Sequence, residues 1–181
     1  MPPRNASDVP QDVVRALSLG ERESRDLVEA FTVDFAILLE AALPEIPQSA
    51  IRAMRDGASL AYTKRMRLAA ELANQHLGDD SFDALCAHAS DTARGWAAYI
   101  AGLGDRRLDA RLEMIRPLAD DHHFGVREWA WLGIRDAIAS EPTEAVRLLE
   151  PWTDEPGGQL AQRRSEDPSR MGAFTLRPMV R

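Results

Sequence analysis

Residues 92–97 read TARGWA, and residues 125–130 read GVREWA. The two stretches align without gaps as x-[Ala/Val]-Arg-x-Trp-Ala, and equivalent positions are 33 residues apart. Residues after the first stretch recur 34 positions later in three pairs: Leu112 and Val146, Ile115 and Leu149, Pro117 and Pro151. A repeat of this length that contains two helices is typical of an α-solenoid, whose helix pairs bury their apolar faces by stacking on one another.

Most of the remaining sequence also has the spacing of short amphipathic helices. Apolar residues recur at every third or fourth position over residues 28–42, 51–54, 60–72, 82–85, 91–103, 108–118, 126–138 and 143–149. Strands are disfavoured, because the chain has few β-branched runs, little alternation and no Asn-Gly hairpin turn. The tetratricopeptide and ankyrin signatures are absent. We therefore predict an all-α fold, an α-solenoid of HEAT-like helical pair repeats.

These repeats are expected to form one helical domain over residues 21–153. Residues 1–20, which contain three prolines, are predicted to be a loose N-terminal segment. Residues 154–181 lose the helical pattern, because glycines and prolines interrupt it, and are predicted to be an irregular tail.

Composition and charge exclude several classes of protein. The chain has 181 residues, of which 45% are hydrophobic, so it has the material for a packed core and is not expected to be disordered. Its net charge of -7, from 22 basic and 29 acidic side chains, argues against a simple polybasic nucleic-acid binder. A local basic face remains compatible with this net charge.

Cysteine, histidine and apolar patterning exclude further classes. Cys86 is the sole cysteine, so no intrachain disulfide and no Cys-x-x-Cys motif exists, and a reducing cytoplasm fits. Residues 1–24 lack the apolar core of a signal peptide, and residues 35–43 are too short an apolar stretch to span a membrane. His122 and His123 are adjacent and point in different directions on a helix. We therefore expect no metal and no cofactor.

Arg94 and Arg127 occupy the same position of the repeat, and Arg67 is a candidate third copy. On a concave solenoid face such a ladder of arginines grips successive phosphates of duplex DNA. In the alternative interpretation, each arginine pairs with an acidic residue of the neighbouring repeat. Asp91 and Glu128 are the carboxylates near this ladder and are candidate functional residues. In the alternative interpretation, Asp91 is a helix N-cap and Glu128 is a surface charge.

Tryptophans recur two positions after each arginine. Positions i and i+2 of a helix do not share a face, so Trp96 and Trp129 are predicted to lie in the core. Trp131 is in phase with Arg127 and Glu128 and is predicted to lie on the functional face. There its ring would stack on an arginine plane or on a base.

Two longer stretches carry a resemblance to a known family. Residues 90–99 read SDTARGWAAY, and residues 115–131 read IRPLADDHHFGVREWAW. They resemble the HEAT-like-repeat DNA alkylation repair proteins, the AlkC/AlkD group, and are closer to the AlkC branch. The phrase FGVREWA at residues 124–130 is its most specific part, and the resemblance is best over about residues 80–152.

The resemblance implies an enzyme class and its site. Proteins of this group are monofunctional DNA glycosylases that wrap duplex DNA in a concave basic solenoid and excise cationic N3- or N7-alkylated purines. Matched position by position, Glu128 is the best candidate for the carboxylate that stabilises the developing cationic sugar, followed by Asp91. Arg94 and Arg127 would contact phosphate or hold the carboxylates, and Trp131 would contact DNA. The expected partner is duplex DNA with alkylated bases, and no cofactor is implied.

The ending departs from the family, whose members normally continue with further helices and a basic segment. We expect a truncated, frame-shifted or divergent ending after about Trp152, with the enzyme either active or degenerate. A non-enzymatic HEAT-like scaffold that binds a protein partner remains the alternative function. A third interpretation is a solenoid fragment that is stable together with further repeats or as an oligomer. A positive concave face would favour DNA, and an acidic or apolar one would favour a protein.

Overall fold

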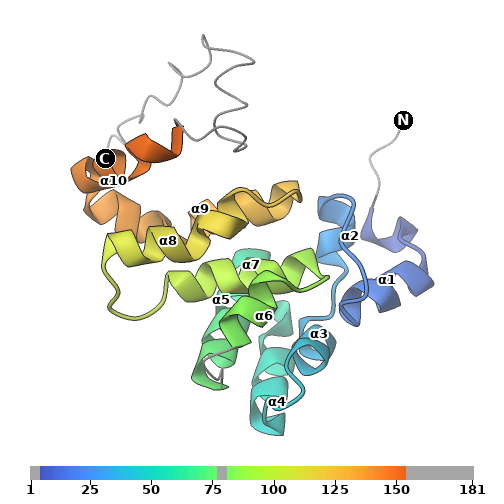
Figure 1. Ribbon diagram of the computed structural model, residues 1–181. Helices are drawn as coiled ribbons and strands as arrows, with labels where there is room; N and C mark the ends of the chain where they lie inside the picture. Colours follow the sequence, from blue (N-terminus) through green and yellow to red (C-terminus); the bar gives the residue numbers. More distant parts are fainter. Residues whose placement is uncertain (1–4, 77–80, 154–181) are drawn as a thin grey trace, which may run out of the picture. The chain divides into compact units, whose positions relative to one another are not determined.

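The computed structural model describes residues 5–76 and 81–153, and over these residues the chain is all-α without a strand (Figure 1). The prediction of an all-α chain is confirmed. The chain divides into two units, residues 1–139 and 140–181. The predicted irregular tail, residues 154–181, lies outside the described residues.

Among the described residues, nine α-helices belong to the first unit, with the last residue of α9 assigned to the second unit. These helices are α1 Gln11–Ser18, α2 Leu27–Phe31, α3 Phe35–Ala42, α4 Gln48–Asp56, α5 Tyr62–His76, α6 Ser81–Cys86, α7 Asp91–Ala101, α8 Leu108–Ala119 and α9 Phe124–Ser140. Two short 3-10 helices accompany them, η1 Ala6–Asp8 and η2 Gly57–Ser59. The second unit contains α10 Pro142–Leu149 and the 3-10 helix η3 Glu150–Thr153.

The N-terminal region is more ordered than its sequence suggests. Residues predicted to be loose form η1 and α1, and the side chains of Val9 and Leu17 are buried. Pro10, which reads as a helix breaker, instead occupies the position directly before α1. A proline there costs no hydrogen bond, because the first N–H groups of a helix have no partner inside it. The prediction of a loose segment is therefore wrong for residues 6–18.

The single helix predicted over residues 28–42 is interrupted. It is divided into α2 and α3, because Asp34 begins a new helix. The carboxylate of Asp34 accepts hydrogen bonds from the backbone N–H groups of Ala36 and Ile37, at 2.9 and 3.1 Å. This N-cap satisfies donors that an uninterrupted helix would have bonded to the preceding turn.

Helix α7 is the centre of the first unit, since all eleven of its residues are buried. It contacts α3, α5, α6 and α8 (Figure 1). Trp96 of α7 is fully buried, and Trp129 of α9 is 5% exposed, so the prediction that both tryptophans lie in the core is confirmed. Glycine permits a close approach of α7 and α9, because a Cβ on Gly133 would lie 2.3 Å from the carbonyl oxygen of Ala98.

The buried Arg111 of α8 holds the C-terminal end of α7. Its guanidinium donates three hydrogen bonds to backbone carbonyl oxygens, to Ala101 at 3.1 Å, Gly104 at 2.6 Å and Arg106 at 2.9 Å. Ala101 is the last residue of α7, and the last carbonyls of a helix have no partner within it, so Arg111 supplies a donor to this helix end and ties the following loop to it. None of the described helices has the length and apolar character needed to cross a membrane.

Candidate functional site

The loops that precede α7 and α9 repeat the same hydrogen bonds. Arg94 donates to the carbonyl oxygens six and five residues before it, at 2.7 and 3.4 Å. Arg127 donates to the carbonyl oxygens at the same two offsets, at 2.6 and 2.9 Å. The 33-residue sequence repeat is therefore also a repeat of local structure, in which each arginine closes the loop before its own helix.

A second pair of hydrogen bonds follows the same period. His88 Nδ1 accepts from the backbone N–H of Ser90 at 3.0 Å. One repeat later, the Asp121 carboxylate accepts from the backbone N–H of His123 at 2.7 Å. His88 and Asp121 are thus equivalent positions of the repeat that accept the same backbone hydrogen bond with different side chains. The sequence repeat does not show this equivalence, because the two residue types differ.

Arg94 is buried in a network of ion pairs. Its Nε lies 2.8 Å from Asp121 Oδ2, and its Nη2 contacts both Asp121 and Glu23. Burial lowers the pKa of Arg94, but the hydrogen bonds that Arg94 donates to Glu23 and Asp121 outweigh this effect and raise the pKa overall. Because the residue is 5% exposed and its donors are engaged internally, Arg94 matches the alternative interpretation, a tie to the neighbouring repeat.

Asp91 is fully buried at the start of α7. Its two carboxylate oxygens accept hydrogen bonds from the backbone N–H and the hydroxyl of Ser24, at 3.1 and 2.5 Å. His123 Nε2 lies 3.6 Å from the same carboxylate and 2.7 Å from the carbonyl oxygen of Ser24. Asp91 therefore connects the segment before α2 to the starts of α7 and α9. Burial and the charge of Asp91 also raise the pKa of the Tyr62 phenol.

Glu128, the other candidate carboxylate, is exposed on α9. Trp131, Leu132 and Arg135 follow it at helical spacings of three, four and seven residues and share its face. Trp131 is half-buried. Asp91 and Glu128 thus occupy opposite environments, one inside the core and the other on the surface, so the structure does not give them a common exposed site.

A pocket of about 210 Å³ lies on this side of α9. We call it the basic pocket, and its lining residues are Thr63, Lys64, Arg67, Tyr99, Leu132, Arg135 and Asp136. Its three cations face a single acidic residue, Asp136, whose carboxylate is 3.9 Å from Arg67 and 3.7 Å from Arg135. The pocket therefore has an excess of positive charge in an acidic protein.

Tyr99 links Glu128 electrostatically to the basic pocket. Burial raises the pKa of the Tyr99 phenol, the charges of Arg67 and Arg135 oppose this rise, and the charge of Glu128 adds to it. Sequence analysis did not identify Tyr99, Lys64 or Arg135. The helical phase of Arg135 with Glu128 was the available signal for one of them.

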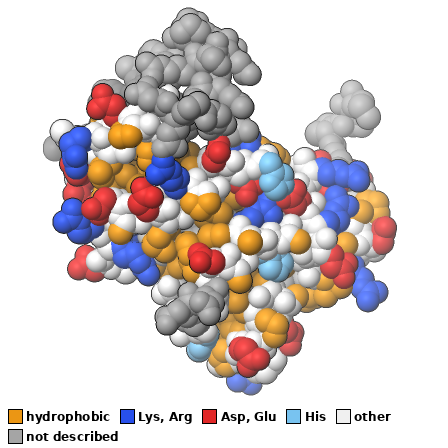
Figure 2. All heavy atoms as spheres, in the orientation of Figure 1, with side chains coloured by type: hydrophobic (Ala, Val, Ile, Leu, Met, Phe, Trp, Pro, Cys, Tyr) orange, Lys and Arg blue, Asp and Glu red, His pale blue; other side chains and the backbone are white. Residues whose placement is uncertain are grey.

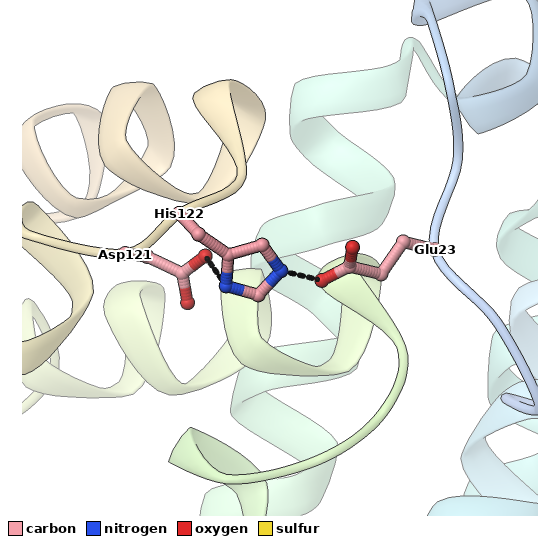
Figure 3. Close-up of side chains that lie close together, drawn as sticks. All are labelled: Glu23, Asp121 and His122. Atoms are coloured by element: carbon pink, nitrogen blue, oxygen red, sulfur yellow. Dashed lines mark ion pairs between the residues drawn. The ribbon is translucent and has the colours of Figure 1, made fainter.

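His122 lies between two carboxylates, as Figure 3 shows. Its Nε2 is 2.7 Å from Glu23, and its Nδ1 is 3.4 Å from Asp121. These residue types bind divalent cations, and their potential ligand atoms lie within 4.8 Å of one another. However, the guanidinium of Arg94 already contacts both carboxylates, and its charge opposes that of a second cation. The arrangement is therefore best described as a surface extension of the Arg94 ion-pair network.

Comparisons with protein-family models, with curated proteins and with solved structures find no match for this chain. On the face drawn in Figure 2, basic and acidic side chains are interspersed. A site that selects an anion on this protein is consequently expected to be a local feature, such as the basic pocket.

Proposed function

We propose that this chain is a DNA alkylation repair protein that binds duplex DNA and excises cationic N3- or N7-alkylated purines. The observation that carries the proposal is the position of Glu128, an exposed carboxylate on the helix face that also borders the basic pocket. A glycosylase of this kind needs both elements, cations for the DNA backbone and a carboxylate for the sugar that becomes positive.

In this proposal, Lys64, Arg67 and Arg135 contact DNA phosphates. Lys64 and Arg135 are on different helices, α5 and α9, and line the same pocket, so both cations face the same stretch of DNA backbone in this proposal. They replace Arg94 and Arg127 as the main phosphate contacts, since the guanidinium of Arg94 is buried in internal ion pairs. Trp131 contributes a half-buried ring on the same face of α9.

The reaction requires little acid catalysis, because an alkylated purine is already a cationic leaving group. When the bond between C1′ and the purine nitrogen breaks, its electron pair neutralises the purine, and positive charge develops on the deoxyribose. The carboxylate of Glu128 stabilises this charge electrostatically. Water then adds to C1′ and releases a proton to solvent. Asp91, buried against Ser24, acts as a positioning residue that fixes the start of α7.

The proposal includes the HEAT-like solenoid of helical pairs. It is supported by the equivalent hydrogen bonds of Arg94 and Arg127, which give two successive loops the same geometry one repeat apart. Repeats of this kind present residues at equivalent positions to a long ligand. Duplex DNA, with its regular phosphates, is a ligand of that form.

A direct test incubates the full chain with duplex DNA that contains one 7-methylguanine and measures the free base by chromatography. Binding is measured in parallel by fluorescence anisotropy at several salt concentrations. We expect base release by the wild type, its loss in Glu128→Gln with binding retained, and roughly tenfold weaker binding by Arg135→Ala. Arg52→Ala, which removes an exposed charge from α4, is the matched control and should leave both unchanged.

The results have distinct meanings. Binding without base release would overturn the excision step, and the absence of DNA binding would overturn the whole proposal. A non-enzymatic scaffold for a protein partner is the second candidate. It is favoured by the internal hydrogen bonds of Arg94, which leave this repeat arginine unavailable to DNA, and an absence of DNA binding would leave it as the remaining candidate.

A further inference from the structure

A second pocket, of about 330 Å³, lies elsewhere in the first unit and shares no lining residue with the basic pocket. It is formed by the end of α2, the start of α3, the end of α4 and the first turn of α5. We call it the aromatic–arginine pocket, after the side chains that characterise its lining: Phe31, Phe35, Met54, Arg55 and Arg65. Nothing in the proposed DNA chemistry uses these residues.

The aromatic walls of this pocket are ordered against one another. The rings of Phe31 and Phe35 each meet the Tyr62 ring edge-on, with centroids 4.8 and 5.5 Å apart. Phe31 is nevertheless 50% exposed, although phenylalanine is usually buried. An exposed ring that is held in place by its neighbours offers a flat apolar surface to a planar ligand.

Arg65 is oriented by the same rings. Its guanidinium carbon lies 4.8 Å from the centroid of Phe35 and 5.4 Å from that of Tyr62. Stacking of this kind fixes the plane of the guanidinium while leaving its edge, which carries the N–H donors, for another partner. The Nε of Arg65 is buried and has no hydrogen-bond partner among the described residues.

The arginines of the pocket lack acidic partners within the part of the chain that the structure describes. Over residues 5–76 and 81–153, the side chains of Arg55 and Arg65 form no ion pair with an acidic residue. Asp34 is the acidic residue of the lining, and its carboxylate is engaged by the backbone N–H groups at the start of α3. By contrast, the buried guanidinium groups of Arg94 in α7 and Arg111 in α8 each donate several hydrogen bonds.

The geometry points to a binding site for an aromatic phosphate monoester of the size of a nucleoside 5′-monophosphate. The phosphate lies between Arg55 and Arg65, whose two positive charges match a phosphate dianion, and the aromatic group lies against the exposed face of Phe31. The volume of about 330 Å³ falls in the range of pockets that enclose small ligands. The two arginines belong to regular helices, Arg55 to α4 and Arg65 to α5.

Isothermal titration calorimetry of the full chain tests this assignment. The probes are adenosine 5′-monophosphate, phenyl phosphate, inorganic phosphate and adenosine. We expect both aromatic phosphates to bind, and inorganic phosphate and adenosine to bind at least about tenfold more weakly, since each lacks half of the recognised group. Equal binding of inorganic phosphate would overturn the aromatic contact, and equal binding of adenosine would overturn the phosphate contact.

Variants connect the binding to this pocket. Arg55 is exposed and forms no ion pair with another described residue, so Arg55→Gln is expected to fold normally and to weaken binding about tenfold. Arg52→Gln, one turn away on α4 and outside the lining, is the charge-matched control and should bind as the wild type does. The assignment is overturned if neither aromatic phosphate binds, or if Arg55→Gln and Arg52→Gln behave alike. The two pockets share no lining residue, so the outcome of this titration does not decide whether the protein binds DNA or releases a base.

Discussion

Arg94 and Arg127 make the same pair of hydrogen bonds, each to the carbonyl oxygens five and six residues before it. Their surroundings differ in one respect. Arg94 also pairs with Glu23 and Asp121, whereas the Nε of Arg127 is buried without a hydrogen-bond partner among the described residues. The same repeat position therefore has a stronger structural role in the first copy than in the second.

The first prediction concerns this difference. Arg94→Ala removes a buried guanidinium and leaves two carboxylates close together, so we expect the free energy of unfolding to fall by about 3 kcal/mol. Arg127→Ala removes bonds to backbone carbonyls and should cost about 1 kcal/mol. Urea denaturation measures both. Arg52→Ala is the surface control, expected to stay within about 0.5 kcal/mol of the wild type. Equal losses in the two repeat variants would contradict the assigned roles.

The second prediction concerns pH. Burial, with a contribution from the charge of Arg94, lowers the pKa of His88 below its ordinary value. Below the ordinary pKa of about 6.5 the unfolded chain binds a proton that the folded chain does not, so the free energy of unfolding falls as pH falls from about 7.5. The stability that neutral His88 contributes is therefore fully present above about pH 7.5 and is lost progressively at lower pH.

His88→Asn isolates this effect. Asparagine keeps an oxygen that accepts the backbone N–H of Ser90, but it does not titrate. The variant should therefore lose less stability than the wild type between pH 7.5 and 5.5, as measured by urea denaturation at each pH. All other side chains are the same in the two proteins, so the difference between their pH profiles reports on His88 alone. Parallel pH profiles would show that His88 does not carry the dependence.

The sequence predicts the parts of this fold that depend on local spacing. The spacing of two residues between each arginine and its tryptophan predicts that Trp96 and Trp129 turn away from the arginine face and into the core, and both are buried. Glu23, one of the partners of Arg94, could not be predicted from the sequence, because it is 71 residues away in a segment without periodicity. A repeat indicates that two arginines are equivalent, but it does not indicate whether they face solvent or the preceding loop.

The candidate site shows the same limit. Glu128 and Trp131 lie on a common face of α9, as their helical spacing predicted, whereas Asp91 is enclosed by Ser24 and His123. The contact with Ser24 depends on how the N-terminal helices pack, and no periodic pattern describes that packing. The pockets were likewise not predictable, because each collects side chains from three or more separated elements.

The third prediction concerns the thiol of Cys86. Burial, helped by the charge of Asp83, raises its pKa to about 12. Since the thiolate is the reactive form, alkylation by iodoacetamide at pH 8 should be at least about a hundredfold slower in the folded chain than in urea. Mass spectrometry of timed samples gives both rates. Comparable rates would mean that the thiol is more accessible than its position on α6 implies.

The fourth prediction separates the two candidate carboxylates. Asp91→Asn replaces an acceptor of two hydrogen bonds with a group whose NH₂ faces the donors of Ser24, so we expect the free energy of unfolding to fall by about 2 kcal/mol. Glu128→Gln alters an exposed side chain and should change stability by less than about 0.5 kcal/mol. In the base-release assay, the variant with the smaller loss of stability is expected to lose more activity. Glu128→Gln is expected to abolish release, and Asp91→Asn to retain part of it at low temperature, where the variant remains folded. Loss of release in Asp91→Asn with unchanged stability would instead indicate that Asp91 reaches the DNA.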